Sequence, residues 1–340
     1  MCDGLTVPLR SLDGVVRLLI VKILIAGGTS FVGRAISLAA LVAGHDVTVL
    51  NRGMTPNNLP TSVKRLIGDR HGDLTSLQGL EFDATIDTVA YQRRDVEGLA
   101  HALGGRGGHY VQISSISAYV EPGRAGSTET TPLRGLGTLD PNSEVTGATY
   151  GALKSECERA AHDHFPSVAV VRPSYVFGAH DKTFRFPYWV HRIARGGNVA
   201  YPGPGANAVQ WIDARDLAQL VVTVTERGWM GAVHACGEYP AISYRAMLER
   251  VAAVVAPTGT SFHEIDPSLL SDHSWYQTFP LWSGGASSPV MEMDNSLAVS
   301  LGMPLTPLEE TVRETAAWLQ GVVAPSWWLS AEAESELLSR

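Results

Sequence analysis

The sequence predicts an α/β protein with a doubly wound parallel sheet and a smaller, mainly helical second domain. Short apolar stretches of strand length alternate with segments whose apolar residues recur at helical spacing. The first apolar run ends in a glycine cluster and leads directly into a helical pattern. The chain has 340 residues, 45% of them hydrophobic and 18% charged, which is enough to bury a large core.

The strands expected in the first half are short and rich in β-branched residues. They are the segments KILIAG, DVTVLN, VKRLIG, DATIDTVA and HYVQISS. Between them, FVGRAISLAALVAG and RRDVEGLAHALGG repeat apolar residues every three or four positions, which predicts helices. A helix over residues 147–164 and the strand SVAVVRPS continue the alternation. This order predicts a parallel sheet with helices on both faces.

The second half is less regular and predicts that the chain leaves the sheet domain and returns to it. DARDLAQLVVTVTERG has the pattern of a helix with Asp213 as its N-cap, and GAVHACG has that of a strand. The smaller domain would pack at the carboxyl ends of the strands, where such sheets bind ligands. The expected boundaries are 1–20 for an N-terminal extension, 21–172 and about 207–240 for the sheet domain, 173–206 and 241–330 for the second domain, and 331–340 for a C-terminal tail.

Charge and composition favour small-molecule partners. The chain has 26 Lys and Arg against 34 Asp and Glu, a formal net charge of -8, and its basic residues are scattered. Nucleic-acid binding is therefore not expected, because such proteins carry a basic patch. No stretch has the roughly 18 uninterrupted apolar residues of a membrane helix.

The three cysteines, Cys2, Cys157 and Cys236, are odd in number and widely spaced. They have no metal-ligand spacing, so no metal is expected, and they suit a reducing compartment. We therefore expect a cytoplasmic location.

The stretch LIAGGTSFVGRA, residues 24–35, is the first candidate binding element. A strand that ends in glycines and leads into a helix lets the backbone approach a pyrophosphate, while the helix N-terminus offers free N–H groups. Gly27, Gly28 and Gly33 would supply the tight turn and the close packing. Turns of this kind also occur for purely structural reasons, so the stretch favours a nucleotide without requiring one.

A second candidate element is ATYGALKSECERA. Tyr150 and Lys154 are four residues apart and therefore lie on one face of a helix. A nearby ammonium group favours the phenolate and gives a usable proton donor and acceptor. Ser114 and Ser115 end the fifth expected strand, where a hydroxyl could bond a substrate oxygen. The alternatives are an exposed helix pair and two serines that simply close a strand.

The segments GGTSFVG, ISSISAY, YGALK and VVRPSYVFG, in this order, resemble the short-chain dehydrogenase/reductase superfamily. They are most similar to its extended and atypical branch, the NAD-dependent epimerase/dehydratase-like proteins. The resemblance covers roughly residues 21–325, including QWIDARDLA and EETVRETAAWL. It implies a Rossmann fold that binds a dinucleotide, and hydride transfer between nicotinamide and a carbonyl or secondary alcohol.

By this resemblance, Tyr150 is the acid/base, Lys154 lowers its pKa and holds the nicotinamide ribose, and Ser115 orients the substrate oxygen. Ser115 is preferred to Ser114 because the family's serine or threonine stands four residues before the tyrosine that here is Tyr119. The implied cofactor-binding residues are Gly27, Thr29, Ser30, Phe31, Val32, Gly33, Arg34, Asn51, Arg52, Asp69, Tyr150, Lys154 and Pro173. The residues placed where the family builds its substrate pocket are Tyr175, His180, Trp189 and Trp211.

Two departures from the family pattern concern the cofactor. Ser30 replaces the middle glycine of the usual fingerprint. The second strand ends in Asn51 and Arg52 instead of the acidic residue that holds the ribose 2′-hydroxyl for NAD. Arg52, helped by Arg34, would suit a 2′-phosphate, so NADP(H) is favoured and NAD(H) remains possible. Otherwise the two arginines are ordinary solvated surface. Asp69 resembles the aspartate that contacts adenine.

A third departure narrows the chemistry. The family's dehydratases place an Asp-Glu pair after the catalytic serine or threonine, and this chain has Ile116 and Ser117 there. Sugar dehydration is therefore disfavoured, and an NADP(H)-dependent oxidoreductase is expected.

The alternatives are a nucleotide-sugar epimerase with tightly bound NAD and a non-catalytic RNA-binding protein. Relatives with GGT-F-G and NRG signatures bind chloroplast RNA stem-loops, but they generally lose the Tyr-Lys pair that is intact here. Family members often form homodimers, through helices that here include the one carrying Tyr150.

Overall fold

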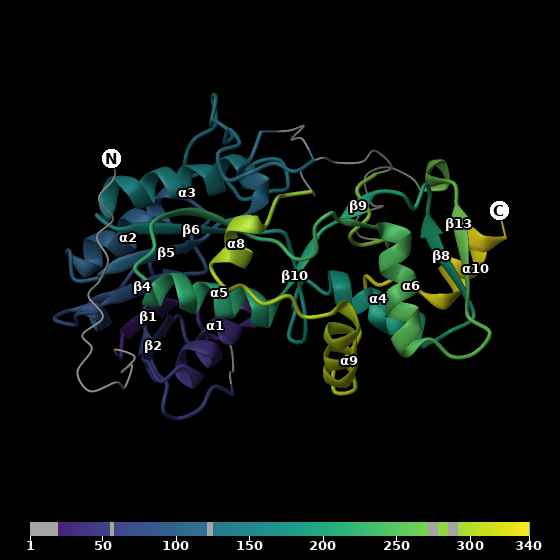
Figure 1. Ribbon diagram of the computed structural model, residues 1–340, viewed down its shortest axis with the longest axis horizontal. Helices are drawn as coiled ribbons and strands as arrows, with labels where there is room; N and C mark the ends of the chain where they lie inside the picture. The colour runs from purple at the N-terminus through teal and green to yellow at the C-terminus, as the bar shows by residue number, and fades with distance from the viewer. Residues whose placement is uncertain (1–19, 55–57, 121–124, 271–277, 285–291, 340) are drawn as a thin grey trace.

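The computed structural model describes residues 20–54, 58–120, 125–270, 278–284 and 292–339. Its largest element is a seven-stranded sheet with the strand order β11-β6-β5-β4-β1-β2-β3, and every neighbouring pair is parallel. Helices cover both faces of the sheet (Figure 1), which confirms the predicted doubly wound α/β fold. Apart from Ile20, the expected N-terminal extension lies outside the described residues.

The strands of this sheet are the apolar segments that the sequence predicts. They are β1 (Lys22–Ala26), β2 (Asp46–Asn51), β3 (Lys64–Ile67), β4 (Ala84–Asp87), β5 (His109–Ile113), β6 (Val168–Pro173) and β11 (Gly231–Ala235). The central strand β1 is buried on both faces, because Ile23, Leu24 and Ile25 are all inaccessible to solvent. Continuous burial of this kind is normal for a parallel strand between two helix layers.

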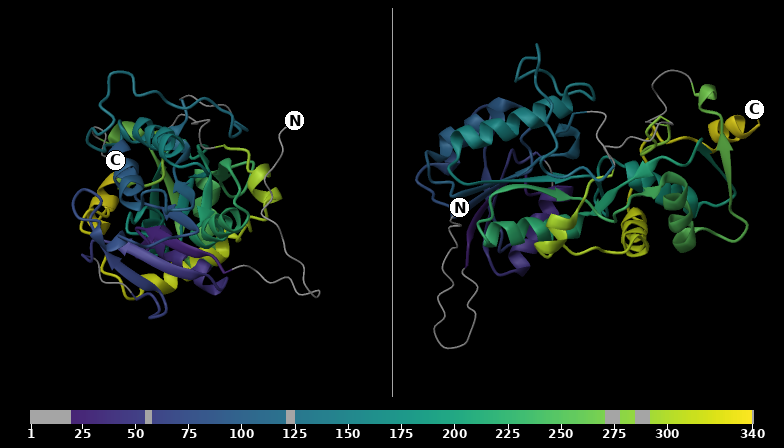
Figure 2. Two further views of the ribbon diagram at one scale, coloured as in Figure 1. Left: turned by 90° about the vertical axis from the view of Figure 1, so that its left-hand side faces the viewer. Right: turned by 45° about the horizontal axis from the view of Figure 1, so that its top comes forward.

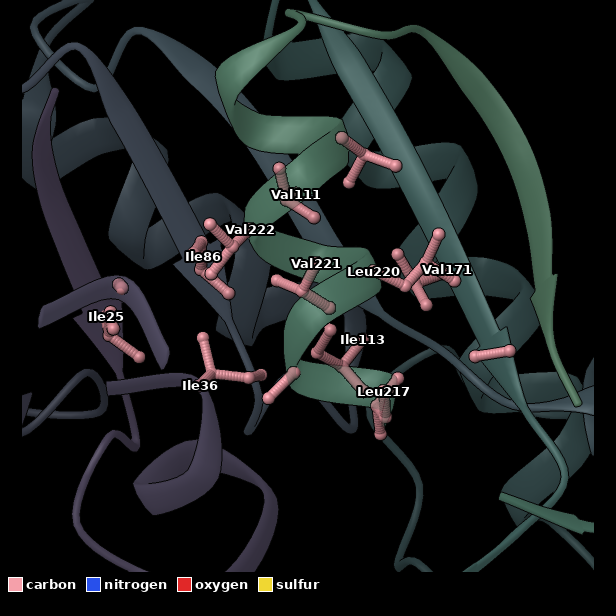
Figure 3. Packing of buried hydrophobic residues seen from close by; sticks show 14 of the residues in the cluster. Ile25, Ile36, Ile86, Val111, Ile113, Val171, Leu217, Leu220, Val221 and Val222 are labelled. Atoms are coloured by element: carbon pink, nitrogen blue, oxygen red, sulfur yellow. The ribbon is translucent and has the colours of Figure 1, made fainter. Parts of the chain in front are cut away.

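Two pairs of helices form those layers. Helices α1 (Phe31–Val42) and α5 (Ala214–Glu226) cover one face, and α2 (Arg93–Leu103) and α3 (Tyr150–His164) cover the other (Figures 1 and 2). In Figure 3, side chains of α5 pack between α1 and the sheet. Asp213 caps α5 as predicted, since its carboxylate accepts a hydrogen bond from the Arg215 backbone N–H at 2.7 Å.

The chain leaves the sheet after β6, returns through α5 and β11, and leaves it again. The smaller part lies beyond the carboxyl ends of the strands (Figure 1). Its elements are β7 (Tyr175–Phe177), α4 (Arg185–Ala194), β8 (Asn198–Pro202), β9 (Ala208–Val209), β10 (Trp211–Asp213), β12 (Ile242–Ser243), α6 (Tyr244–Val255), β13 (Ser261–Ile265), α9 (Leu308–Leu319) and α10 (Ala331–Leu338).

This smaller part, which we call the α4/α6/α9 region, has its own aromatic core. Phe186, Trp189 and Tyr244 are all buried in it. Its strands form three short pairs: β8 with β13 and β10 with β7 are parallel, and β12 with β9 is antiparallel. Three short 3-10 helices complete the described structure: η1 (Thr75–Leu77), η2 (Ile116–Ala118) and η3 (Pro267–Leu269).

Two segments pack differently from their expected places. Helix α10 occupies the range expected as a C-terminal tail, and its buried Glu334 pairs with Arg192 and accepts a hydrogen bond from the Ala200 backbone N–H at 3.0 Å. Helix α8 (Ser296–Ser300) lies in the range expected for the second domain but packs against β11. Its neighbour Met303 is part of the core cluster of the sheet. No described helix is both long and apolar enough to cross a bilayer.

Candidate active site

In the turn between β1 and α1, the backbone of the first turn of α1 lies close to the backbone at the end of β1. Gly27 has φ +84, a left-handed conformation that favours glycine. A Cβ at Gly33 would lie 2.2 Å from the Gly27 carbonyl oxygen, so no side chain fits there. These two positions require glycine, and together they let the first turn of α1 pack directly on the strand end.

Ser30, which replaces the family's middle glycine, is accommodated by the backbone. Its φ of -134 is an extended conformation that any residue adopts, and Phe31 after it takes φ 36. The Ser30 side chain makes no capping hydrogen bond to α1. The first N–H groups of α1 are therefore not occupied by this residue and are available to an anion.

A cleft of about 580 Å³ opens beside this turn, at the carboxyl ends of β1, β2, β3 and β4. Its volume is in the range of small-molecule sites. The cleft joins the glycine turn to residues that follow the next two strands. Its lining includes Gly27, Thr29, Ser30, Asn51, Arg52, Gly68, Asp69, Arg70, His71, Val89, Tyr91 and Val145. Six of the predicted cofactor residues are therefore brought together in it.

The end of β2 carries an excess of positive charge. Arg52 is exposed and lines the cleft, and the Arg34 guanidinium donates to the Asn58 side-chain oxygen at 3.2 Å. Neither arginine has a carboxylate within ion-pair distance among the described residues. Asn51 accepts a hydrogen bond from the Gly53 backbone N–H at 2.8 Å and so shapes this turn.

The loop after β3 is fixed by a buried ion pair that the sequence did not reveal. Both terminal nitrogens of Arg70 donate to the Asp87 carboxylate at 3.0 Å, and Asp87 is inaccessible to solvent. Burial lowers the pKa of Arg70, but the charge and hydrogen bonds of Asp87, together with Tyr110 and Asp95, more than offset it and raise that pKa. This pair holds Asp69 at the cleft edge. The sequence did contain a hint of the Arg70–Asp87 pair, because the segment DATIDTVA places an aspartate at a strand end.

Ser115 and Tyr150 meet where η2 packs against the start of α3. The Ser115 hydroxyl accepts a hydrogen bond from the Ser117 backbone N–H at 3.1 Å, and it lowers the pKa of the neighbouring Tyr150. A Cβ at Gly151 would lie 2.1 Å from the Ser117 carbonyl oxygen, so glycine is needed for this close contact. The Ser-Tyr pair predicted from the sequence is therefore assembled by a third residue, Gly151.

Burial raises the pKa of Tyr150, and two groups oppose this effect without cancelling it. They are the hydrogen bond from Ser115 and the positive charge of Arg185. Tyr150 is therefore protonated at neutral pH. This is the form that can donate a proton to a carbonyl oxygen.

Lys154 is buried behind the Ser-Tyr pair. Its ammonium donates to the backbone oxygens of Ala90 at 2.8 Å and Ile113 at 2.7 Å, and it lies 5.2 Å from the centroid of the Tyr91 ring. Lys154 is not among the groups that shift the pKa of Tyr150, whereas its charge lowers the pKa of Tyr91 against the larger effect of burial.

Tyr91 links the cleft to this group and was missed by sequence reasoning. It lines the cleft, and its ring centroid is 6.4 Å from that of Tyr150. Burial raises the pKa of Tyr91, and the Lys154 charge opposes this. Its neighbour Gln92 donates to the backbone oxygens of Asn142 at 2.9 Å and Ser143 at 2.6 Å, which anchors the loop that carries Val145 over the cleft. The sequence feature that could have pointed to Tyr91 and Gln92 is their place in the loop that follows β4.

Two of the four expected substrate residues are partly accessible to solvent. Tyr175 and His180 are both partly exposed. Trp189 is wrongly predicted, because it is fully buried and its indole N–H donates to the Pro280 oxygen at 2.7 Å inside the aromatic core. Trp211 is 4% exposed and stacks on Phe177 with a centroid distance of 5.4 Å. Packing thus accounts for both tryptophans.

A second cavity, of about 270 Å³, lies beside β10 and α9. Its buried carboxylates already have partners: Asp213 accepts from Arg215 and Thr311, and Asp216 accepts from Thr306. In the part of the chain that the structure describes, no group of three or more His, Cys, Asp or Glu side chains is placed to hold a metal ion.

Comparison with curated proteins finds two reductases and a chloroplast stem-loop binding protein. The chain is 28% identical over 221 residues to 2-alkyl-3-oxoalkanoate reductase of Stenotrophomonas maltophilia, covering 59% of this chain and 64% of that one. It is 28% identical over 241 residues to 2'-dehydrokanamycin reductase of Streptomyces kanamyceticus, covering 68% and 65%. It is 27% identical over 219 residues to chloroplast stem-loop binding protein of 41 kDa b of Arabidopsis thaliana, covering 60% and 54%. The matches thus span less than two thirds of each relative.

Solved structures share the fold over nearly the whole chain. UDP-N-acetylglucosamine 4-epimerase from Bacillus cereus superposes with a TM-score of 0.65 at 16% identity, covering 91% of this chain and 99% of that one. MoeE5 in complex with UDP-glucuronic acid and NAD has a TM-score of 0.64 at 18% identity, covering 88% and 99%. The model of the NAD dependent epimerase/dehydratase family matches residues 81–234, which include Ser115, Tyr150 and Lys154. The family model and the shared fold agree with the resemblance to the NAD-dependent epimerase/dehydratase family that the motifs predicted.

Proposed function

We propose that the protein is an NADP(H)-dependent oxidoreductase that interconverts a carbonyl and a secondary alcohol of a small molecule, with Tyr150 as the acid/base. The observation that carries this proposal is the placement of Ser115 and Tyr150 together, with the buried Lys154 behind them and Tyr91 linking them to the cleft beside the glycine turn. The names of two relatives describe reductases, which agrees with this chemistry.

The cleft suits a dinucleotide in shape and charge. The uncapped start of α1 and the glycine turn would receive the pyrophosphate, and Asp69 would contact the adenine. Arg34 and Arg52 would bind a 2′-phosphate, which supports NADP(H) over NAD(H). When bound, the nicotinamide supplies or accepts the hydride. We assign this role to residues 21–172 with about 207–240, and substrate binding to 173–206 and 241–330.

The side chains would handle the proton. In the direction of reduction, the Tyr150 hydroxyl donates its proton to the substrate oxygen, and the Ser115 hydroxyl offers that oxygen a second hydrogen bond. Two of the three ammonium N–H groups of Lys154 bond backbone oxygens, so the third can bond a ribose hydroxyl. Lys154 thus acts on the cofactor and holds the strand ends in place.

The direct test is NADPH oxidation with a panel of ketones by the wild type and by Tyr150→Phe. We expect Tyr150→Phe to lose about 10²–10⁴-fold in kcat, because the proton donor is removed. Its Kd for NADPH, measured by fluorescence titration, should stay within a factor of about two. Near-normal turnover by this variant would contradict the assignment of Tyr150.

A nucleotide-sugar epimerase is the second candidate, favoured by the fold shared with two enzymes that act on or bind UDP-sugars. An epimerase must keep its cofactor through each cycle. Mass spectrometry of nucleotide released from the denatured protein separates the two: stoichiometric NAD⁺ favours an epimerase, and exchangeable NADP(H) favours the reductase.

RNA binding is disfavoured by the acidic balance and the intact Tyr-Lys pair, although one relative is named as a stem-loop binding protein. Tight, salt-sensitive retention of a structured RNA on a filter would overturn our proposal. We also expect a reducing, cytoplasmic setting. A homodimer through α3 stays a prediction that sedimentation would test.

A further inference from the structure

Arg185 is brought to the substrate side of the Ser-Tyr pair by the α4/α6/α9 region. It is the first residue of α4, and the carbon of its guanidinium group lies 5.0 Å from the centroid of the Tyr175 ring. Tyr175 packs against the small cluster that contains Ile116, the residue after Ser115. Strand β7 therefore places Arg185 opposite the first turn of α3.

Arg185 is exposed and, within the described part of the chain, has no counter-ion. The less exposed arginines Arg70, Arg172 and Arg192 each bind a carboxylate, those of Asp87, Glu158 and Glu334 respectively. Among the described residues, no carboxylate lies within ion-pair distance of Arg185, and its Nε donates only to the Thr183 hydroxyl, at 3.2 Å.

The nearest acidic residue in sequence, Asp181, does not neutralise this arginine. Asp181 is buried and accepts a hydrogen bond from the Thr183 backbone N–H at 2.8 Å. The Arg185 charge lowers the pKa of Asp181 and also that of Tyr150 and Tyr175, in each case against the larger effect of burial. The exposed guanidinium group thus lies over the Tyr175 ring and acts on the acid/base.

We propose that Arg185, supported by the Tyr175 ring, binds an anionic oxygen group of the substrate, so that the substrate is a carbonyl compound with a carboxylate or phosphate near the reacting carbon. A guanidinium group binds either anion through two parallel hydrogen bonds, and this would fix the carbonyl relative to Ser115 and Tyr150. The inference rests on the proposed function and adds the substrate class to it.

The test compares matched charged and neutral substrates. The pairs are 3-oxooctanoate with its methyl ester, and dihydroxyacetone phosphate with dihydroxyacetone, each assayed with NADPH. For the preferred anion, the wild type should show a kcat/KM about 30-fold above that of the neutral partner. Arg185→Gln should reduce this ratio to about 1. A loss of kcat/KM that is equal for both substrates leaves the ratio unchanged and does not affect the test. Arg185→Lys should give an intermediate ratio.

Arg195→Gln is the control, because Arg195 is an exposed arginine at the other end of the same helix. It should keep the wild-type ratio. Equal use of charged and neutral substrates by the wild type would overturn the proposal, as would a ratio that survives in Arg185→Gln. A large rise in the Kd for NADPH in that variant would also overturn it, since Arg185 would then bind the cofactor. The pair with the larger ratio identifies the anion.

Failure of the proposed function gives a different result. If no carbonyl compound is reduced, the melting temperature of the NADP⁺-saturated protein still tests the anion site. A rise with 3-oxooctanoate or dihydroxyacetone phosphate, but not with its neutral partner, and its loss in Arg185→Gln, would support the site. Equal or absent shifts in both proteins would reject it.

Discussion

In the proposed active site, the cofactor side is formed mainly by backbone and the substrate side mainly by side chains. The cofactor side consists mainly of backbone at the ends of the strands of the parallel sheet, where glycines remove side chains from the contact. The substrate side consists of side chains on short elements, such as Tyr175 on a three-residue strand and Arg185 at a helix start. Backbone geometry tolerates few substitutions, whereas side chains can be exchanged without altering the fold.

This difference explains why the two sides respond differently to mutation. A change on the cofactor side should disturb folding and nucleotide binding together, because one backbone arrangement serves both. A change on the substrate side should alter which molecules react while the fold and cofactor affinity persist. Four predictions, three on substitutions and one on pH, test this difference between the two sides.

Gly33→Ala should have the largest effect. The new methyl group would lie 2.2 Å from the Gly27 carbonyl oxygen, so the turn must open. We expect a loss of about 1–3 kcal/mol in the free energy of unfolding and a rise of roughly 30-fold in the Kd for NADPH. Urea denaturation and fluorescence titration measure the two. Gly321→Ala, where no atom lies within 4 Å, is the control and should change neither.

The pH dependence should follow the protonation of Tyr150. Because burial raises its pKa, the protonated donor persists into the alkaline range, and ketone reduction should stay level from about pH 6 to 9. Alcohol oxidation needs the phenolate, so its kcat/KM should rise by up to about tenfold per pH unit over the same range. Rate profiles in both directions measure this. An oxidation rate that falls as pH rises would break the assignment.

Arg52→Gln should change cofactor choice by about tenfold. Loss of one charged hydrogen bond to a 2′-phosphate costs about 1.5 kcal/mol, so the Kd for NADPH should rise while that for NADH stays constant. Arg227→Gln removes an exposed arginine at the end of α5 and is the matched control. Equal changes in the Kd for NADPH and in the Kd for NADH would show that Arg52 does not bind the 2′-phosphate.

Tyr91 should give the smallest effect. Tyr91→Phe keeps the ring beside the Lys154 ammonium and should leave kcat/KM within a factor of about two. Tyr91→Ala removes the ring and the cation–π contact of about 0.5–1 kcal/mol, so kcat/KM should fall roughly threefold. If Tyr91→Phe were as damaging as Tyr91→Ala, the hydroxyl would have a direct part in the reaction.

The sequence predicted the sheet and the glycine turn between β1 and α1 well, because both depend on local pattern. Alternating periods locate the strands, and a glycine cluster between strand and helix has few structural solutions. Ser30 looked like a departure, yet its extended backbone makes the side chain harmless.

The substrate side could not be predicted in the same way. Periodicity placed an aromatic residue at Trp189 but could not show that this side faces the core of the α4/α6/α9 region. The partners of Lys154 depend on backbone oxygens from two separate strand ends, which no local pattern contains. Tyr91 and Arg185 gain their significance only when tertiary structure brings them beside Tyr150.

The chain passes repeatedly between the sheet and the α4/α6/α9 region, and this affects how the molecule unfolds. Strand β11 is paired along β6, and α8 and Met303 complete the core beneath α5 after the chain has visited the smaller part. Neither part can be cut out as a continuous stretch. The two should therefore melt as a single cooperative unit, and a truncation that removes α8 should loosen the nucleotide-binding sheet even though it removes no residue that touches the cleft.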